Sequence, residues 1–291
     1  MSKPKWRRIL YEKQPYPDNY TDATFLNLLR KNVNVRRYTL SHLCFQASVT
    51  ILLHLNKIIL FVFTLLKIES DVWQPNLVLN FAFIFTIIAY FFWYLSMRKA
   101  HKETYIDPTV KSGLLIIVVI FGLSPLLKTL TSDVSVDSIW FLATLAFTIN
   151  AIWHDYSSEN CMDIVFPGTI SINAAIFGSV LLASRNTNST LKVASILSIS
   201  IVTFALFPAA ERHLRHFSPK TCLCLSIILL STTLYLIKEW SNSYYWISFY
   251  CFVVILIILV FPAGMIYSLK YKNAISGPWD EAKPAIGNDL K

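Results

Sequence analysis

Strongly polar side chains interrupt several long apolar runs, and these are the residues whose types and spacing could do chemistry. They are His54, Asn56, Lys57, Asn150, His154 and Asn173, and Asp155 follows directly after one of the runs. Such groups are costly among apolar ones, so they pair with each other or line a polar cavity. The candidates for one such cavity are Asn150, His154, Asp155 and Asn173. Lys57 either pairs with a neighbour or extends its amine toward water, and both a structural and a catalytic role stay open for it.

A second candidate site lies near the C-terminus, in the sequence GPWDEA. Gly277 and Pro278 predict a turn there, which would present Trp279 beside Asp280 and Glu281 outside any apolar run. An aromatic anchor beside charges is a common hot spot of protein interfaces, so Trp279, Asp280 and Glu281 are candidates for docking a partner. The competing interpretation is that Trp279 returns to the membrane interface, where tryptophan is also favoured.

Metal and cofactor chemistry is not indicated. Glu211, His213 and His216 are residue types that bind metals, but Arg212 and Arg215 lie between them and would repel a cation. The five cysteines form no CxxC pair, and the sequence has no GxGxxG, P-loop, DxD, HExxH or GxSxG motif. We therefore expect no metal, no cofactor and no catalytic residue. On its residues alone the chain looks like a polytopic scaffold or a lipid-binding subunit.

The elements that must position these residues are membrane-spanning helices. Hydrophobic residues make up 55% of the chain and charged residues only 15%, whereas soluble domains carry about 25% charged residues. Apolar runs recur along most of the length. The expected spans are 41–66, 76–97, 111–130, 138–154, 164–184, 191–209, 221–237 and 245–269. We predict an all-α polytopic membrane protein with about eight transmembrane helices.

The fifth expected span carries a small side chain at every fourth position. This ladder consists of Ser171, Ala175, Ser179 and Ala183. Residues four apart share one face of a helix, and small side chains on that face let two helices approach closely in lipid. We expect the ladder to pack against another helix. Asn173 lies in the same span, and its amide is expected to bond to a neighbouring helix or to line the polar cavity.

The charge distribution predicts the orientation. The net charge is +9, and residues 1–40 hold nine Lys and Arg and a short amphipathic helix. Eight spans place both termini on one side. Twenty of the 26 Lys and Arg would then lie on that side and five on the other, which makes both termini cytoplasmic. We predict a cytoplasmic basic arm at 1–40, an eight-helix membrane domain at 41–269 and a cytoplasmic tail at 270–291.

Four segments carry a resemblance to a known family. They are KWRRILYEKQPYPDNYTDATFLNLLRKN, GLSPLLKTLTSDVSVDSI, SINAAIFGSVLLASR and GPWDEA. Together they resemble the PIG-C family, whose members are membrane subunits of the phosphatidylinositol N-acetylglucosaminyltransferase complex. The resemblance implies a multi-pass protein of the endoplasmic reticulum membrane that acts in the first step of GPI-anchor biosynthesis. In that step, N-acetylglucosamine passes from UDP-GlcNAc to phosphatidylinositol.

The resemblance also implies that this chain is a non-catalytic subunit. Its partners would be a separate catalytic glycosyltransferase subunit, other membrane subunits, phosphatidylinositol and membrane lipid, with no nucleic acid. Two other classes stay open. A polytopic glycosyltransferase that uses a lipid-linked sugar needs a catalytic acid in a sizeable lumenal loop. The first lumenal loop offers Glu69 and Asp71, but it is only about ten residues long. A lipid transporter or scramblase predicts internal repeats with matching broken helices, and Pro125 and Pro167 do not form a convincing pair.

The predicted orientation can be tested in sealed microsomes. We expect added protease to remove a tag from either terminus, because both ends carry the basic excess that stays in the cytoplasm. A tag inserted at Asn188, between the fifth and sixth spans, is the control and should stay protected. Protection of either terminal tag would contradict the eight-span arrangement.

Overall fold

The computed structural model describes a helical protein. The described residues are 6, 11, 13–17, 20, 27, 30–32, 38–99, 106–127, 129, 131, 133–156, 168–185, 189–241, 243–273 and 275–276. Its elements are β1 (Arg30–Lys31), α1 (Leu40–Ala47), α2 (Leu53–Glu69), α3 (Pro75–Lys99), α4 (Ile106–Leu127), α5 (Val136–Ile152), α6 (Thr169–Ser184), α7 (Thr190–Ile201), α8 (Phe207–Phe217), α9 (Pro219–Trp240), α10 (Tyr244–Ile255), α11 (Phe261–Leu269) and β2 (Ile275–Ser276). Three π-helical turns join consecutive helices, at Ser48–Leu52, Val202–Leu206 and Leu256–Val260.

The helices group into eight continuous runs within the described residues, close to the eight expected spans. The all-α class and the polytopic membrane character are thus confirmed. Four runs are long and apolar enough to cross a membrane by length and composition: Leu40–Glu69, Thr190–Glu211, Lys220–Trp240 and Tyr244–Leu269. Four shorter apolar helices accompany them: Pro75–Phe91, Leu115–Leu127, Val136–Ile152 and Thr169–Ser184. The sixth candidate span ends at Glu211, two residues beyond the expected residue 209, and α8 continues the helix to Phe217.

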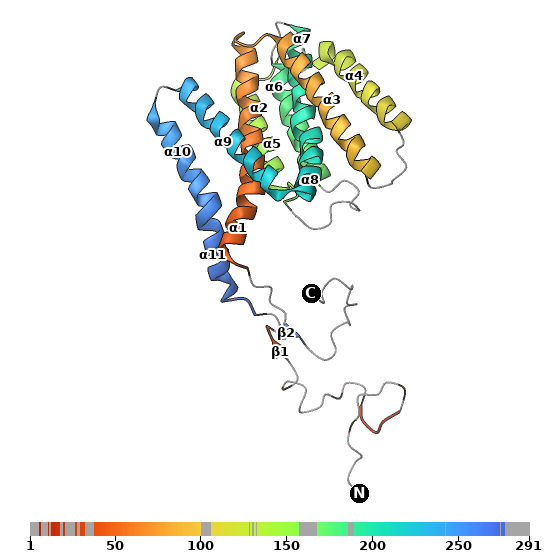
Figure 1. Ribbon diagram of the computed structural model, residues 1–291, viewed down its shortest axis with the longest axis vertical. Helices are drawn as coiled ribbons and strands as arrows, with labels where there is room; N and C mark the ends of the chain where they lie inside the picture. Colours follow the sequence, from red (N-terminus) through yellow and green to blue (C-terminus); the bar gives the residue numbers. More distant parts are fainter. Residues whose placement is uncertain are drawn as a thin grey trace. The chain divides into compact units, whose positions relative to one another are not determined.

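Residues 41–262 form one compact unit. In it, α2 packs on α9, α5 on α6, and α7 lies among α2, α3, α4 and α6 (Figure 1). Phe61 of α2, Phe147 of α5 and Phe204, in the turn after α7, meet at the centre with ring centroids 5.2–5.8 Å apart. Such ring contacts favour one arrangement of the helices through shape and aromatic geometry. Lipid is as apolar as these side chains, so packing quality decides the association.

The most extensive helix pair is α5 with α6, and small residues make it possible. Ser171, Ala175, Ser179 and Ala183 of α6 are all buried, with at most 1% of each residue exposed. At Gly178, on the same helix, an added Cβ would lie only 3.1 Å from the Cβ of Ala146 in α5. The Ser179 hydroxyl donates to the carbonyl of Ala175, so it brings no unpaired polar group into the contact. The two backbones therefore approach closely.

The π-helical turn Ser48–Leu52 is supported by a neighbouring helix. Such a turn changes the hydrogen-bond register of the backbone, and freed carbonyls in a membrane need another donor. The Ser226 hydroxyl of α9 donates to the carbonyl of Ser48 at 2.8 Å. A serine 178 positions later in the sequence thus supplies a hydrogen bond to a backbone carbonyl of the first helix.

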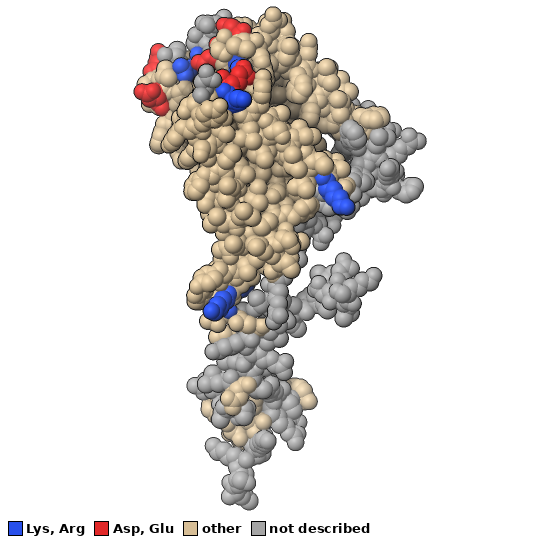
Figure 2. All heavy atoms as spheres, turned by 60° about the vertical axis from the view of Figure 1, so that its left-hand side comes forward, with Lys and Arg blue, Asp and Glu red and all other residues tan. Residues whose placement is uncertain are grey.

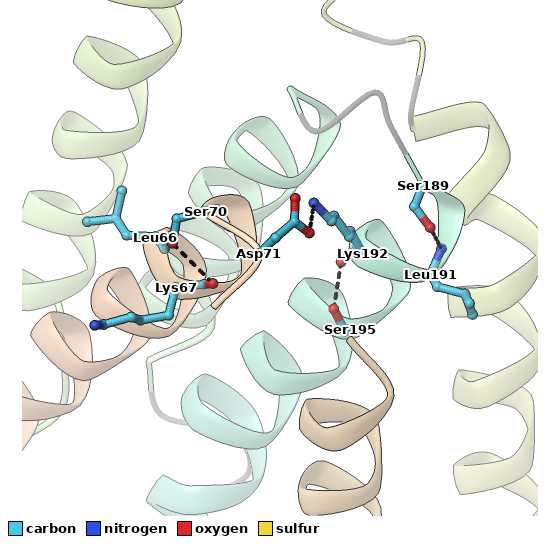
Figure 3. Close-up of polar contacts among 8 residues, drawn as sticks. All are labelled: Leu66, Lys67, Ser70, Asp71, Ser189, Leu191, Lys192 and Ser195. Carbon is cyan, nitrogen blue, oxygen red and sulfur yellow. Dashed lines mark hydrogen bonds and ion pairs between the residues drawn. The ribbon is translucent and has the colours of Figure 1, made fainter. Parts of the chain in front are cut away.

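Ion pairs gather at one end of the compact unit, where Figure 2 shows acidic and basic side chains together above an uncharged flank. Lys67 pairs with Glu239, Arg185 with Glu69, and Lys192 with Asp71. Figure 3 shows how the turn after α2 brings Asp71 to Lys192 at the start of α7. Asp71 has a φ of 59°, a left-handed conformation that aspartate adopts more readily than most residues. These pairs tie the helix ends together and neutralise three basic residues.

Residues 1–40 and 263–291 form a second unit. In it, β1 pairs antiparallel with β2, so that Arg30 lies opposite Ser276 and Lys31 opposite Ile275. A short segment before the first helix is therefore hydrogen-bonded to one that follows the last helix.

The close approach of α5 and α6 predicts a strong effect at Gly178. We expect Gly178→Leu to lower the unfolding free energy by roughly 1–3 kcal/mol or more, because the larger side chain must push Ala146 and its helix away. The measurement is thermal unfolding of the purified chain in detergent. Gly122→Leu in α4 is the control, since no described atom lies within 4 Å of an added Cβ there. Equal unfolding temperatures for the two variants would contradict the packing.

Candidate functional site

A buried hydrogen-bond network joins α2, α5 and α6 at the end of α6 opposite the ion pairs. The Asn150 amide nitrogen donates to the carbonyl of Ser171 at 2.9 Å and to its hydroxyl at 2.8 Å. The Ser171 hydroxyl donates to the carbonyl of Asn150 at 2.9 Å. Asn150 Oδ1 lies 3.0 Å from His54 Nε2. A backbone carbonyl can only accept, so the contact with the Ser171 carbonyl identifies which atom of the Asn150 amide is the nitrogen. Asn150 Oδ1 therefore accepts the hydrogen bond from His54, whose Nε2 must carry a proton.

Two aromatic side chains cover this network. The ring of His154 stacks on that of His54, with centroids 3.8 Å apart. The Tyr156 ring lies edge-on to both histidines. Its hydroxyl donates to the carbonyl of Ala151 at 2.5 Å. Burial, and then the negative charge of Glu211, raise the pKa of Tyr156 to about 12, so the hydroxyl stays protonated at neutral pH.

An ion pair is buried beside the network. Lys57 Nζ lies 2.9 Å from Glu211 Oε2, with only 3% and 4% of the two side chains exposed. The ammonium also lies 5.0 Å from the ring centre of Phe207, a cation–π contact. Removing two charges from water is costly, and only close geometry with further polar contacts offsets the cost. The pair therefore links α2 to α8.

We call these seven residues the inner polar cluster: His54, Lys57, Asn150, His154, Tyr156, Ser171 and Glu211. Most of its hydrogen-bond donors and acceptors bind one another. Nδ1 of His54 is the exception, since it is buried without a hydrogen-bond partner among the described residues. Among those residues, no three His, Cys, Asp or Glu side chains group as metal ligands. The arrangement favours holding four helices together over reacting with a substrate.

A separate buried contact joins α2, α9 and α10. Oδ1 of Asn56 accepts hydrogen bonds from Thr233, at 2.8 Å, and from the hydroxyl of Tyr250. The amide nitrogen of Asn56 has no hydrogen-bond partner within the described part of the chain. This contact ties the α9–α10 pair to the remaining helices.

Comparison with known proteins gives the family. A family model described as phosphatidylinositol N-acetylglucosaminyltransferase matches residues 6–280. The chain belongs to this family. A relative from Dictyostelium discoideum, named as a putative subunit of that transferase, is 36% identical, with 96% of this chain and 79% of the relative covered. A human relative, also named as a subunit of the transferase, is 31% identical, with 98% and 94% covered.

A fission yeast member, from Schizosaccharomyces pombe, is named as the GPI2 subunit. It is 30% identical, with 98% of this chain and 88% of the relative covered. No solved structure matches the chain. The resemblance to the PIG-C family that the sequence motifs carried is therefore confirmed along nearly the whole chain.

The structure brings together some of the candidate residues of this family member and separates others. Asn150 and His154 lie in the inner polar cluster, and Asp155 follows directly in the chain. Asn173 is exposed instead. It lies two residues after Ser171, and at about 100° per residue it points nearly opposite to the ladder. The docking candidates Trp279, Asp280 and Glu281 lie outside the described residues.

The inner polar cluster also contains residues that the sequence reasoning missed. Glu211 was expected in a loop after residue 209, but it lies in α8 and is 5% exposed. A signal was present, since a lysine within an apolar span needs an acid, and Glu211 follows the sixth apolar run by two residues. The network of His54 with Asn150 and Ser171 left no comparable signal, because many neutral polar side chains could serve as partners, whereas a buried lysine specifically needs an acid.

The buried ion pair predicts a characteristic pattern in a double-mutant cycle. We expect Lys57→Met or Glu211→Leu alone to lower the unfolding free energy by roughly 3–5 kcal/mol, because each leaves its partner buried and poorly compensated. Lys57→Met combined with Glu211→Leu should recover much of that loss. The measurement is thermal unfolding in detergent.

The matched control is the pair of Lys67 with Glu239, whose acid is 43% exposed. Its single variants, Lys67→Met and Glu239→Leu, should each cost about 1 kcal/mol or less, since water replaces a lost partner there. Equal costs at the two pairs would show that burial does not set the strength of the inner one.

Proposed function

We propose that this chain is a non-catalytic membrane subunit of the complex that transfers N-acetylglucosamine from UDP-GlcNAc to phosphatidylinositol, the first step of GPI-anchor biosynthesis. The observation that carries the proposal is the family match over residues 6–280, together with relatives named as subunits of that transferase at nearly full length. The complex works in the endoplasmic reticulum membrane, where this chain is a multi-pass component.

The polar residues support a role without direct chemistry. The sequence has no nucleotide-sugar motif. In the described part of the chain, the buried polar side chains mainly bond to one another across helices. A separate catalytic glycosyltransferase subunit therefore supplies the nucleotide-sugar site, and further membrane proteins complete the assembly.

The chain acts by positioning. The acyl chains of phosphatidylinositol stay in the bilayer, whereas its inositol must reach a catalytic domain in the cytosol. A rigid helical bundle can hold the lipid substrate at a fixed depth and dock that domain above it. Fixing two reactants in the right geometry lowers a reaction barrier without any group of the bundle entering the chemistry.

The topology that suits this role has eight crossings with both termini in the cytoplasm. It divides the chain into an arm at 1–40, a membrane domain at 41–269 and a tail at 270–291. The pairing of β1 with β2 supports termini on one side. In this topology, three of the five basic residues on the opposite side lie in ion pairs with acidic side chains.

The proposal is tested by activity with and without the chain. Cells that lack it should make no GlcNAc-phosphatidylinositol, and the full-length chain should restore synthesis. The chain purified alone should transfer no sugar, whereas the complex recovered through a tag on it should do so. Transfer by the chain alone would instead support a polytopic glycosyltransferase, and synthesis in its absence would remove it from the reaction.

In the same assay, Trp279→Ala tests the docking role of the tail. We expect the variant to insert normally but to recover less of the catalytic subunit, since losing an aromatic anchor costs about 2 kcal/mol, roughly thirtyfold in affinity. Trp73→Ala, at an exposed tryptophan between α2 and α3, is the control and should keep full recovery. Normal recovery with Trp279→Ala would show that Trp279 does not dock the partner.

A further inference from the structure

An apolar pocket of about 420 Å³ opens between α2, α9 and α10. The three helices lie side by side in Figure 1, with α2 against α9 and α9 against α10. The pocket walls include Ile59, Val62 and Phe63 from α2, and Trp246 and Phe249 from α10. They carry almost no polar surface, so the pocket is suited to hydrocarbon.

The pocket has a defined direction. Leu66 and Trp240 line one end, and each is adjacent in sequence to a member of the ion pair between Lys67 and Glu239. Ile58 lines the other end. Eight residues of α-helix separate Ile58 from Leu66, a length of about 12 Å. The pocket thus runs from the charged end of the bundle into its apolar part.

The floor and the rim of the pocket differ. Tyr250 belongs to the floor, because it is 6% exposed and its hydroxyl is already used on Asn56. Trp240, Trp246 and Phe249 form an open rim, with more than half of each residue exposed. Tryptophans beside charges at the end of an apolar surface are typical of the membrane interface. The rim therefore lies at the level of lipid headgroups.

We propose that this pocket binds one acyl chain of a zwitterionic glycerophospholipid whose headgroup lies beside Lys67 and Glu239. These two residues form an ion pair at the mouth, and a headgroup that carries both signs can meet each of them with the opposite charge. A sterol carries only a hydroxyl to meet the two charges.

This lipid is distinct from the substrate of the proposed reaction. In the proposed topology, the mouth of the pocket faces the lumenal leaflet, opposite the cytoplasmic side where the sugar is transferred. The bound chain would fill the space between α2 and the α9–α10 pair, as a cavity-filling side chain does. Binding is measured on the chain alone, so it can fail or succeed independently of the proposed transferase role.

The experiment uses purified full-length chain and phosphatidylcholine that carries a photoreactive diazirine midway along one acyl chain. We expect labelling in the segments 58–66 and 237–250, mapped by mass spectrometry and lost in the presence of excess unlabelled phosphatidylcholine. A cholesterol competitor should leave the labelling unchanged. Labelling elsewhere, labelling that phosphatidylcholine does not displace, or displacement by cholesterol would each overturn the proposal.

Filled-pocket variants provide the second measurement. Val62→Trp fills the pocket from α2 and Ile237→Trp fills it from α9, so either folded variant should lose the displaceable labelling. Ile228→Trp adds the same side chain at an exposed position of α9 away from the pocket and should keep it. Retained labelling in a folded filled variant would overturn the proposal, and the competition result stands on the unmodified chain if neither variant folds.

Discussion

Lys57 and Glu211 are buried together in a region where neither could stay charged at low cost alone. Their pairing fixes α8 against α2, and α8 in turn brings Glu211 near Tyr156 at the end of α5. The same requirement governs the other polar groups, because a membrane interior offers no water to satisfy them. Asn150 and Asn56 each reach across to two other helices. The polar contacts thus specify which helices are neighbours.

Packing supplies what these contacts cannot. Apolar surface gains little by leaving lipid for a helix interface, so close approach and shape carry the association. The α5–α6 pair shows this most clearly, since Gly178 faces Ala146 at a distance that excludes a larger side chain. The Phe61, Phe147 and Phe204 rings then fill the centre of the bundle. Specific polar links and close small-residue contacts together define one arrangement.

The sequence predicted the helices well and their partners poorly, for a physical reason. Hydropathy is a local property, so the runs around α2, α9 and α10 are visible directly. The ladder at Ser171 follows from helical periodicity, and its burial agrees with the expected packing face. Partner identity is not local. Lys57 was expected to pair or to extend toward water, but the choice of Glu211 depends on α8 continuing past the apolar run. The helix that contains Asn173 was visible in the sequence, but its rotation about its own axis was not. That rotation leaves the Asn173 side chain exposed.

The separation of Lys57 and Glu211 in the chain also matters during synthesis. Glu211 is made 154 residues after Lys57, and at roughly 5–20 residues per second this takes about 8–30 seconds. For that time the first helix carries an ammonium whose final counter-ion does not yet exist. It must remain near the translocation machinery or extend the amine to the membrane surface. The first helix can therefore reach its final depth only after the sixth has entered the bilayer.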